Sequence, residues 1–219
     1  MAFDILRVPV LRVLIADDHA ILRRGLKEIL LREFDDAHCG EAGEAAQALD
    51  QVRGGSWDLV ILDVSMPGRS GLDVLRDLKQ LRPDLPVLVL SMHPEDQYAK
   101  RVLAAGAVGY MNKETAPEEL IKAVRRILAG GRYVSEAFAE RLASDLRSDP
   151  GRPIHESLSN REFEVLRMIA SGKTNSQMAD ELRLSLTTVS TYRARILEKL
   201  RMSNNSELMR YAMQNRLIE

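Results

Sequence analysis

Cysteine is nearly absent from this sequence, since Cys39 is the only one among 219 residues. A single thiol cannot form a disulfide within the chain, and it cannot build a cysteine metal cluster. Long apolar runs are also lacking, because segments such as 59–64 and 86–92 fall far short of the roughly 20 residues that a membrane span needs. The first residues do not show the charged-then-apolar pattern of a secretory signal. We therefore expect a protein of the cytoplasm that is not inserted in a membrane.

Excess charge is small overall, with a formal net charge of −1, but it is unevenly distributed. Residues 1–150 contain 20 Lys and Arg against 24 Asp and Glu, whereas residues 151–219 contain 11 against 8. The second segment is therefore weakly basic. A basic end is compatible with nucleic-acid binding, although a solvated surface of mixed charge would give the same balance.

Short apolar segments alternate with helical patterns over the first 130 residues. The segment 59–64 is almost continuously apolar, which is typical of a strand buried on both faces of a parallel sheet. Strands that alternate with helices predict an α/β doubly wound fold with a five-stranded parallel sheet, covered by helices on both faces. The expected strands are 12–16, 37–39, 59–64, 86–91 and 109–111, and the expected helices are 20–31, 43–52, 71–81, 98–105 and 118–129.

Polar residues follow several of these strands. Asp17 and Asp18 come after the first strand, Asp63 ends the third, Ser91 ends the fourth, and Lys113 follows the fifth. The carboxyl ends of such strands share one edge of the sheet. Two carboxylates about 4 Å apart repel by roughly 4 kcal/mol at an effective dielectric near 20, so three acids there require a cation or a raised pKa. Oxygen ligands without His or Cys at metal spacing favour Mg²⁺.

A carboxylate, Mg²⁺, a hydroxyl and a lysine together indicate phosphoryl transfer. Asp63 as nucleophile would give an acyl phosphate, while Lys113 and Ser91 would contact oxygens of the transferred group. Each residue also has a structural explanation, as a helix cap or a solvated turn residue. A Mg²⁺-dependent phosphatase with an aspartate nucleophile would need a second acid two residues later, where Ser65 stands. We therefore do not expect an enzyme.

The C-terminal segment shows a pattern of short helices. Ser159 and Glu162 form a capping-box pattern before a helix, and Asn175 or Ser176 opens a second one. A tight turn at 183–185 precedes a longer helix at 187–200, and a fourth helix is expected at 206–215. A short helix, a turn and a helix with a polar outer face is the arrangement that enters the DNA major groove. The alternative is a small interaction module whose polar face is only solvated.

We divide the chain into a domain at 10–131, a partly helical linker at 132–156, and a second domain at 157–219. We expect a helix at 135–146 in the linker, followed by the turn-rich segment 148–153. The linker either leaves the two domains with few contacts or packs firmly and joins them into one block.

Residues 12–130 resemble the flavodoxin-like receiver domain of bacterial two-component response regulators, through 17–18 (DD), 62–68 (LDVSMPG), 90–91 (LS) and 110–113 (YMNK). The resemblance implies that a histidine kinase phosphorylates Asp63, and that Ser91 and Tyr110 are switch positions beside the phosphate-binding Lys113. It implies a Mg²⁺ site made by Asp17, Asp18, Asp63 and the backbone carbonyl of Ser65. Glu114 stands where many receivers have proline, which leaves open whether a cis peptide shapes that loop.

Residues 157–217 resemble the LuxR-type helix-turn-helix, through 158–162 (LSNRE), 169–175 (IASGKTN), 188–189 (TV) and 199–200 (KL). With the receiver, this pattern resembles the NarL/FixJ class of transcription regulators. Ser190 and Tyr192 replace the Lys and His of its commonest version. The resemblance implies binding to double-stranded DNA, homodimers in the active state, and control by phosphorylation. The alternative is an unphosphorylated receiver that acts as a scaffold for constitutive DNA binding. The candidate DNA contacts are Lys173, Thr187, Thr188, Ser190, Thr191, Arg193, Arg195 and Lys199.

Overall fold

The computed structural model describes residues 10–66, 71–92, 95–145, 153–215 and 217–218. The chain divides into two compact units, Met1–Arg141 and Leu142–Glu219, which are described separately below. Pro67, Gly68 and most of the turn-rich segment predicted at 148–153 lie outside the described residues. No helix among those described is both long and apolar enough to cross a membrane.

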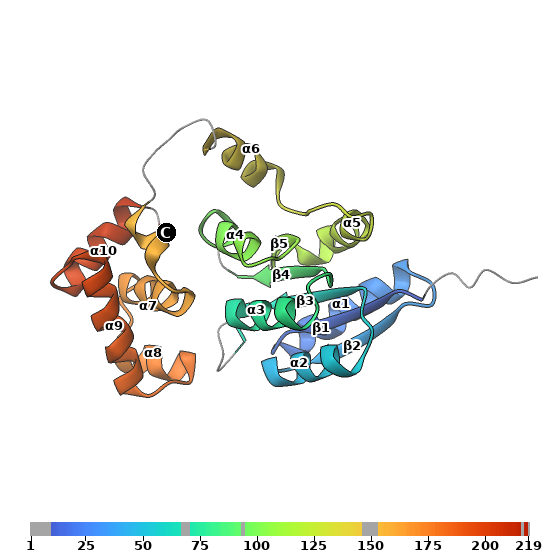
Figure 1. Ribbon diagram of the computed structural model, residues 1–219, viewed down its shortest axis with the longest axis horizontal. Helices are drawn as coiled ribbons and strands as arrows, with labels where there is room; N and C mark the ends of the chain where they lie inside the picture. The colour runs from blue at the N-terminus through green and yellow to red at the C-terminus, as the bar shows by residue number, and fades with distance from the viewer. Residues whose placement is uncertain (1–9, 67–70, 93–94, 146–152, 216, 219) are drawn as a thin grey trace, which may run out of the picture. The chain divides into compact units, whose positions relative to one another are not determined.

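The first unit contains the predicted five-stranded sheet, and every pair of neighbouring strands is parallel. Its strand order is β2-β1-β3-β4-β5, so the chain reverses direction of winding after β2 (Figure 1). The doubly wound α/β fold is therefore confirmed. The strands are β1 (Arg12–Ala16), β2 (His38–Ala42), β3 (Leu59–Asp63), β4 (Val87–Ser91) and β5 (Gly109–Asn112).

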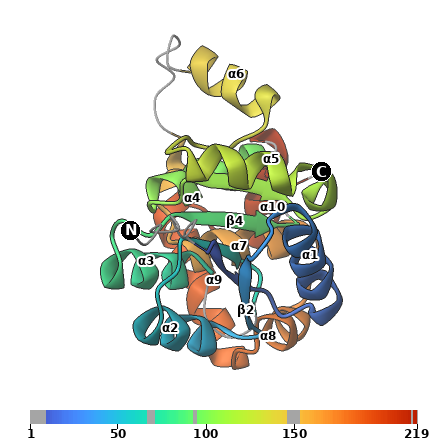
Figure 2. The same ribbon diagram turned by 90° about the vertical axis from the view of Figure 1, so that its right-hand side faces the viewer.

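Helices cover both faces of this sheet (Figure 2). On one face, α1 and α5 pack against alternate strand residues such as Ile15, Ile61 and Leu90, as the two-residue period of a strand requires. On the other face α2 packs beside α3. Every residue of β3 and β4 is buried, which explains their continuous apolar sequence. The helices are α1 (Ala20–Glu33), α2 (Ala45–Gly54), α3 (Gly71–Leu81), α4 (Glu95–Ala104) and α5 (Ala116–Leu128).

Several expected element boundaries are wrong. The second strand runs over His38–Ala42 instead of 37–39, although it contains Gly40 and Glu41. A Cβ atom at Gly40 would lie only 2.3 Å from the ring of Trp57, so the glycine makes room for the indole that packs on this strand. The helices α4 and α5 begin earlier than expected, α5 because Pro117 fits the first helical turn, where no amide donor is required.

The segment after α5 contains one further helix, α6 (Glu136–Asp145), close to the helix expected at 135–146. The boundary between the two units falls within this helix. Before it, Tyr133 forms an isolated parallel bridge with Gly109 of β5. The next described element after α6 is a short 3-10 helix, η1 (Ile154–Ser157).

The second unit is a helical domain built from α7 (Asn160–Ala170), α8 (Asn175–Leu182), α9 (Leu186–Leu200) and α10 (Asn205–Gln214). The capping box predicted at Ser159 and Glu162 is present. The second helix begins at Asn175, one of the two residues expected to open it, and its N-cap Thr174 forms another capping box with Gln177. The helix α9 begins at Leu186, one residue earlier than expected, and Ser185 is its N-cap. The core consists of Phe163, Leu166, Val189, Ile196, Leu208 and their neighbours.

Candidate functional site

Two buried carboxylates and one lysine meet at the carboxyl edge of the sheet. Asp17 follows β1, Asp63 ends β3, and Lys113 follows β5, and each of the three side chains is at least 96% buried. The Lys113 Nζ lies 2.6 Å from Asp63 Oδ2 and 2.8 Å from Asp17 Oδ2. Three strands that are distant in sequence therefore bring these groups to one point, as the sequence predicted from their shared edge.

The loop after β1 adds two more ligand-type side chains. Asp17, Asp18, His19 and Asp63 each offer one ligand atom, and these atoms all lie within 4.8 Å of one another. Asp17 Oδ2 and Asp18 Oδ1 are buried without a hydrogen bond in the described structure, although Lys113 and His19 lie in ion-pair range. Buried carboxylate oxygens in this arrangement suit a small divalent cation with oxygen ligands. His19 was not identified as part of this cluster from the sequence.

Arg23 was also missed by sequence reasoning. Its Nη1 donates a hydrogen bond of 2.6 Å to the backbone carbonyl of Asp17, and its Nε lies 3.6 Å from Glu41 Oε2. Since Arg23 is in the first turns of α1, this contact ties the acidic loop to the helix that follows it. An arginine spaced six residues after the strand-end aspartate was the available signal, but it also fits a solvated helix face.

The environment of Asp63 changes its proton affinity. Burial and, to a smaller extent, the charge of Asp17 raise the pKa of Asp63 to about 6, against the opposing effect of Lys113. Burial works to lower the pKa of Lys113, but the two carboxylates outweigh it and raise that pKa. The site thus contains two carboxylates and one ammonium group, and it can take up one more proton in mildly acidic solution.

The raised pKa of Asp63 predicts how stability depends on pH without added metal. In the folded receiver the pKa of Asp63 is about 6, whereas the ordinary pKa of an aspartate, which applies to the unfolded chain, is 3.8. Between these values the folded state binds more protons, so the free energy of unfolding should fall as pH rises from 4 to 6, by up to about 3 kcal/mol. Urea unfolding in the presence of a chelator measures this dependence. Asp63→Asn should flatten it, and a wild-type curve that rises over this interval would contradict the assignment.

The remaining predicted receiver residues lie around the same edge. Ser91 ends β4 and is completely buried, and its backbone carbonyl accepts a 3.0 Å hydrogen bond from the Lys113 amide. The Ser65 amide donates to Asp63 Oδ1 at 2.7 Å, which places its backbone beside the acid. Tyr110 lies in β5 with its ring fully buried. None of the peptide bonds in the described residues is cis, including that between Lys113 and Glu114.

In the second unit, α8, a turn at Arg183 and α9 form a helix-turn-helix. Arg183 adopts a left-handed backbone conformation with φ of 51°, which ends α8 sharply. The buried face of α9 contains Val189, Ile196 and Leu200. Four of the candidate DNA contacts, Thr187, Ser190, Thr191 and Arg195, are exposed on the opposite side of α9.

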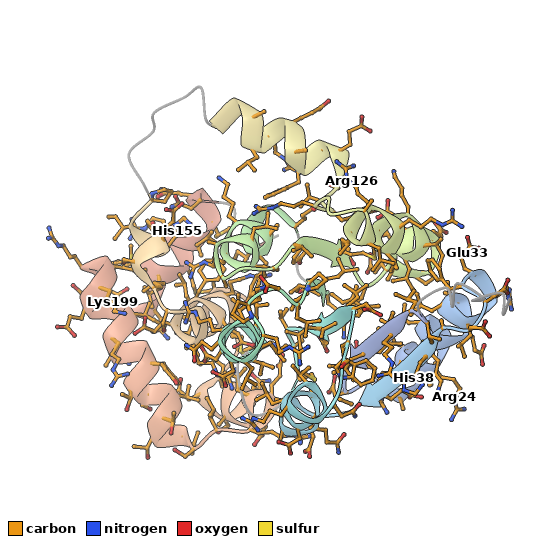
Figure 3. The ribbon with its side chains drawn as sticks, turned by 45° about the vertical axis from the view of Figure 1, so that its right-hand side comes forward. Arg24, Glu33, His38, Arg126, His155 and Lys199 are labelled. Atoms are coloured by element: carbon orange, nitrogen blue, oxygen red, sulfur yellow. The ribbon has the colours of Figure 1, made fainter. Side chains whose placement is uncertain are left out.

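The other candidate DNA contacts have partners within the domain. Lys199 projects from α9 (Figure 3), and its Nζ lies 2.6 Å from Oε2 of the buried Glu162. Burial would raise the pKa of Glu162, but hydrogen bonds from Lys199 and Ser159 hold it below its ordinary value. Lys173 pairs with Glu181, Arg193 donates to Asn205, and Thr188 contacts the capping Ser185. These contacts give the four residues structural roles besides any contact with DNA.

Comparisons with known proteins match both units. Residues 13–125 match the response regulator receiver domain, and residues 156–212 match the bacterial regulatory proteins of the luxR family. The chain is 36% identical over 215 residues to the response regulator GacA of Pseudomonas aeruginosa, covering 95% of this chain and 98% of GacA. It is 32% identical over 213 residues to the response regulator UvrY of Escherichia coli K12, covering 94% and 95%.

A solved structure gives the same result for the fold. RcsB of Salmonella enterica serovar Typhimurium, bound to the promoter rprA in the presence of phosphomimetic BeF₃⁻, is 27% identical with a TM-score of 0.62. The match covers 92% of this chain and 98% of RcsB. Sequence, fold and the order of the two domains along the chain therefore agree, and this chain belongs to the bacterial response regulators of the NarL/FixJ class, with a receiver domain followed by a LuxR-type helix-turn-helix domain.

Proposed function

We propose that a histidine kinase phosphorylates Asp63 and thereby controls binding of α9 to double-stranded DNA. The observation that carries this proposal is the contact of 2.6 Å between Lys113 Nζ and Oδ2 of the fully buried Asp63. The ammonium group is already positioned to neutralise oxygens of a phosphoryl group on Asp63. Ser91, at the end of the neighbouring strand, supplies a hydroxyl group from the same edge of the sheet.

Mg²⁺ fits the remaining donors of this site. Asp17, Asp18 and Asp63 supply carboxylate oxygens, and the backbone carbonyl of Ser65 would complete the protein ligands. A bound Mg²⁺ would neutralise negative charge and polarise the phosphoryl oxygens. Arg23 would keep the acidic loop in place through the Asp17 carbonyl. A carboxylate oxygen of Asp63 forms the bond to phosphorus while the bond from phosphorus to the kinase's histidine nitrogen breaks, so the receiver acts as the acceptor and releases no diffusible product in this step.

For DNA binding, the exposed face of α9 is the proposed reading surface. Thr187 and Thr191 offer methyl groups and hydroxyls, Ser190 offers a hydroxyl, and Arg195 offers a charge to phosphate or guanine. A homodimer would present two such helices to a two-fold operator, in the cytoplasm where the kinase and the DNA are accessible. The relative RcsB is recorded bound to a promoter, which supports the same role for this chain.

The exposed position of Arg195 gives a direct test of the DNA-binding surface. Arg195→Ala should weaken binding to genomic DNA fragments and reduce the slope of log K against log salt by about 0.9, because one phosphate contact is lost. Binding is measured by fluorescence anisotropy over a series of salt concentrations. Arg141→Ala, which removes an exposed arginine from α6, is the matched control and should leave the slope unchanged. Wild-type binding that is independent of salt would contradict a phosphate-contacting helix.

A further inference from the structure

The linker begins as an addition to the edge strand of the receiver sheet. The Tyr133 amide donates a 3.0 Å hydrogen bond to the Val108 carbonyl, and the Tyr110 amide donates one of 2.9 Å to the Tyr133 carbonyl. Gly109 lies between these bonds, and a Cβ atom there would approach the Tyr133 carbonyl to 2.8 Å. The missing side chain of Gly109 therefore permits the close pairing. As a result, Tyr110 shares a backbone hydrogen bond with the first residue of the segment that leads to α6.

Side chains hold the same segment against two helices. The Tyr133 ring is 3% exposed, and burial together with the carboxylates of Glu119 in α5 and Glu95 in α4 raises the pKa of its hydroxyl to about 12. The Ser135 amide donates a 2.9 Å hydrogen bond to Glu95 Oε1, at the start of α4. Ser135 Oγ in turn accepts from the Phe138 amide at 3.1 Å, and the Phe138 side chain is 1% exposed.

We propose that the α4–β5 edge of the receiver is a docking surface for the chain's own segment Tyr133–Phe138, and that this contact transmits the phosphorylation state of Asp63 to α6. Figure 1 shows that α6 follows this segment directly. The inference rests on the proposed function, because it needs a phosphoryl group on Asp63 to act on Ser91 and Tyr110.

Two separate connections link those residues to the segment. Glu95 stands four residues after Ser91, so a displacement of Ser91 at the end of β4 is passed to the start of α4 and to the Ser135 amide. In the second connection, the Tyr110 amide donates a backbone hydrogen bond to the Tyr133 carbonyl. A buried aromatic anchor, Phe138, makes the docked and released positions distinct, because it either fills its site or leaves it.

The coupling between phosphorylation and DNA binding tests this inference. In the full-length chain, DNA affinity is measured with Mg²⁺, in the presence and absence of acetyl phosphate, and the ratio of the two affinities is the coupling factor. Allosteric coupling factors are typically about 5 to 150. Glu95→Ala removes the acceptor of the Ser135 amide and should bring the factor close to 1, while the Asp63 adduct still forms. Tyr133→Phe, which removes only the hydroxyl that interacts with Glu119, should reduce the factor partially.

Glu118→Gln, at an exposed position of α5, is the matched control for loss of a carboxylate and should retain the wild-type factor. Amide hydrogen exchange over residues 136–143 provides a second readout: acetyl phosphate should change it in the wild type and leave it unchanged in Glu95→Ala. If Glu95→Ala keeps both the coupling factor and the exchange response of the wild type, the docking inference is overturned and the proposed function stands. If the wild type forms no adduct, both fail together.

Discussion

Asp63→Asn is expected to abolish the covalent adduct that forms when the protein is incubated with Mg²⁺ and acetyl phosphate. The carboxylate is completely buried at the end of β3, with Lys113 Nζ 2.6 Å from one oxygen and the Ser65 amide 2.7 Å from the other. An amide keeps the shape of the side chain but cannot form an acyl phosphate. Intact-protein mass spectrometry should show one added phosphoryl group in the wild type and none in the variant.

The chemistry of the bond gives a second criterion for this result. An acyl phosphate is stable in acid and labile in base, whereas a phosphoserine on Ser65 or Ser91 would survive mild base. Asp73→Asn is the matched control, because Asp73 lies in the first turn of α3 and its carboxylate pairs with Arg76 of the same helix. It should keep the full yield of adduct. An adduct that persists in Asp63→Asn would place the phosphoacceptor elsewhere and remove the basis of the proposed switch.

If the wild type itself gives no adduct, the scaffold hypothesis takes precedence over the phosphorylation switch. The receiver would then contribute folding and contacts, and DNA affinity would not respond to a phosphodonor. The complete set of acid, hydroxyl and lysine groups around Asp63 argues against this outcome, since a scaffold has no need to bury two carboxylates at a cost of several kcal/mol per ion.

The sheet and the residues at its edge could be predicted because two simple rules determine them. Continuous apolar strands that alternate with helices specify a parallel sheet, and the ends of its strands share one edge. Asp17, Asp63 and Lys113 were therefore placed together from the sequence, and the structure brings them within ion-pair distance. The boundaries of β2 were less predictable, because a glycine does not suggest a strand. The presence of Gly40 within β2 is explained only by the packing of Trp57, which is distant in sequence.

The helix-turn-helix domain shows where sequence reasoning reaches its limit. Helical spacing identifies the outward positions of α9, but it does not reveal which outward charges already have partners. Lys199 is on the outer side by spacing, yet its ammonium group lies 2.6 Å from the buried Glu162 of α7. Similarly, the role of Tyr133 depends on its hydrogen bonds with β5, and a single aromatic residue in a linker carries no periodic signal. Contacts between distant elements determine both cases.

Lys113→Met is expected to lower the free energy of unfolding of the receiver by about 3–5 kcal/mol at pH 8 in the presence of a chelator, because it removes one partner of a buried ion pair. Methionine keeps an apolar side chain of similar length, so the decrease in stability reports the repulsion and burial of the two carboxylates that remain. Asp17 and Asp63 would then be buried side by side without the ammonium group that now lies within 2.8 Å of both. Urea unfolding followed by circular dichroism measures the change.

Three further measurements separate this electrostatic cause from a packing defect. Protonation of Asp63 reduces the repulsion, so the loss in Lys113→Met should be smaller at pH 5 than at pH 8, in keeping with a pKa of Asp63 raised to about 6 even beside the lysine. Mg²⁺ should restore part of the stability, because it binds the folded state and replaces the missing charge. Adding Asp63→Asn to Lys113→Met should also recover part of the loss, since one of the two unpaired charges is gone. If the decrease in the free energy of unfolding is independent of pH, of Mg²⁺ and of the second substitution, Lys113 stabilises the receiver by packing. Its positive charge would then have no part in keeping the two carboxylates together.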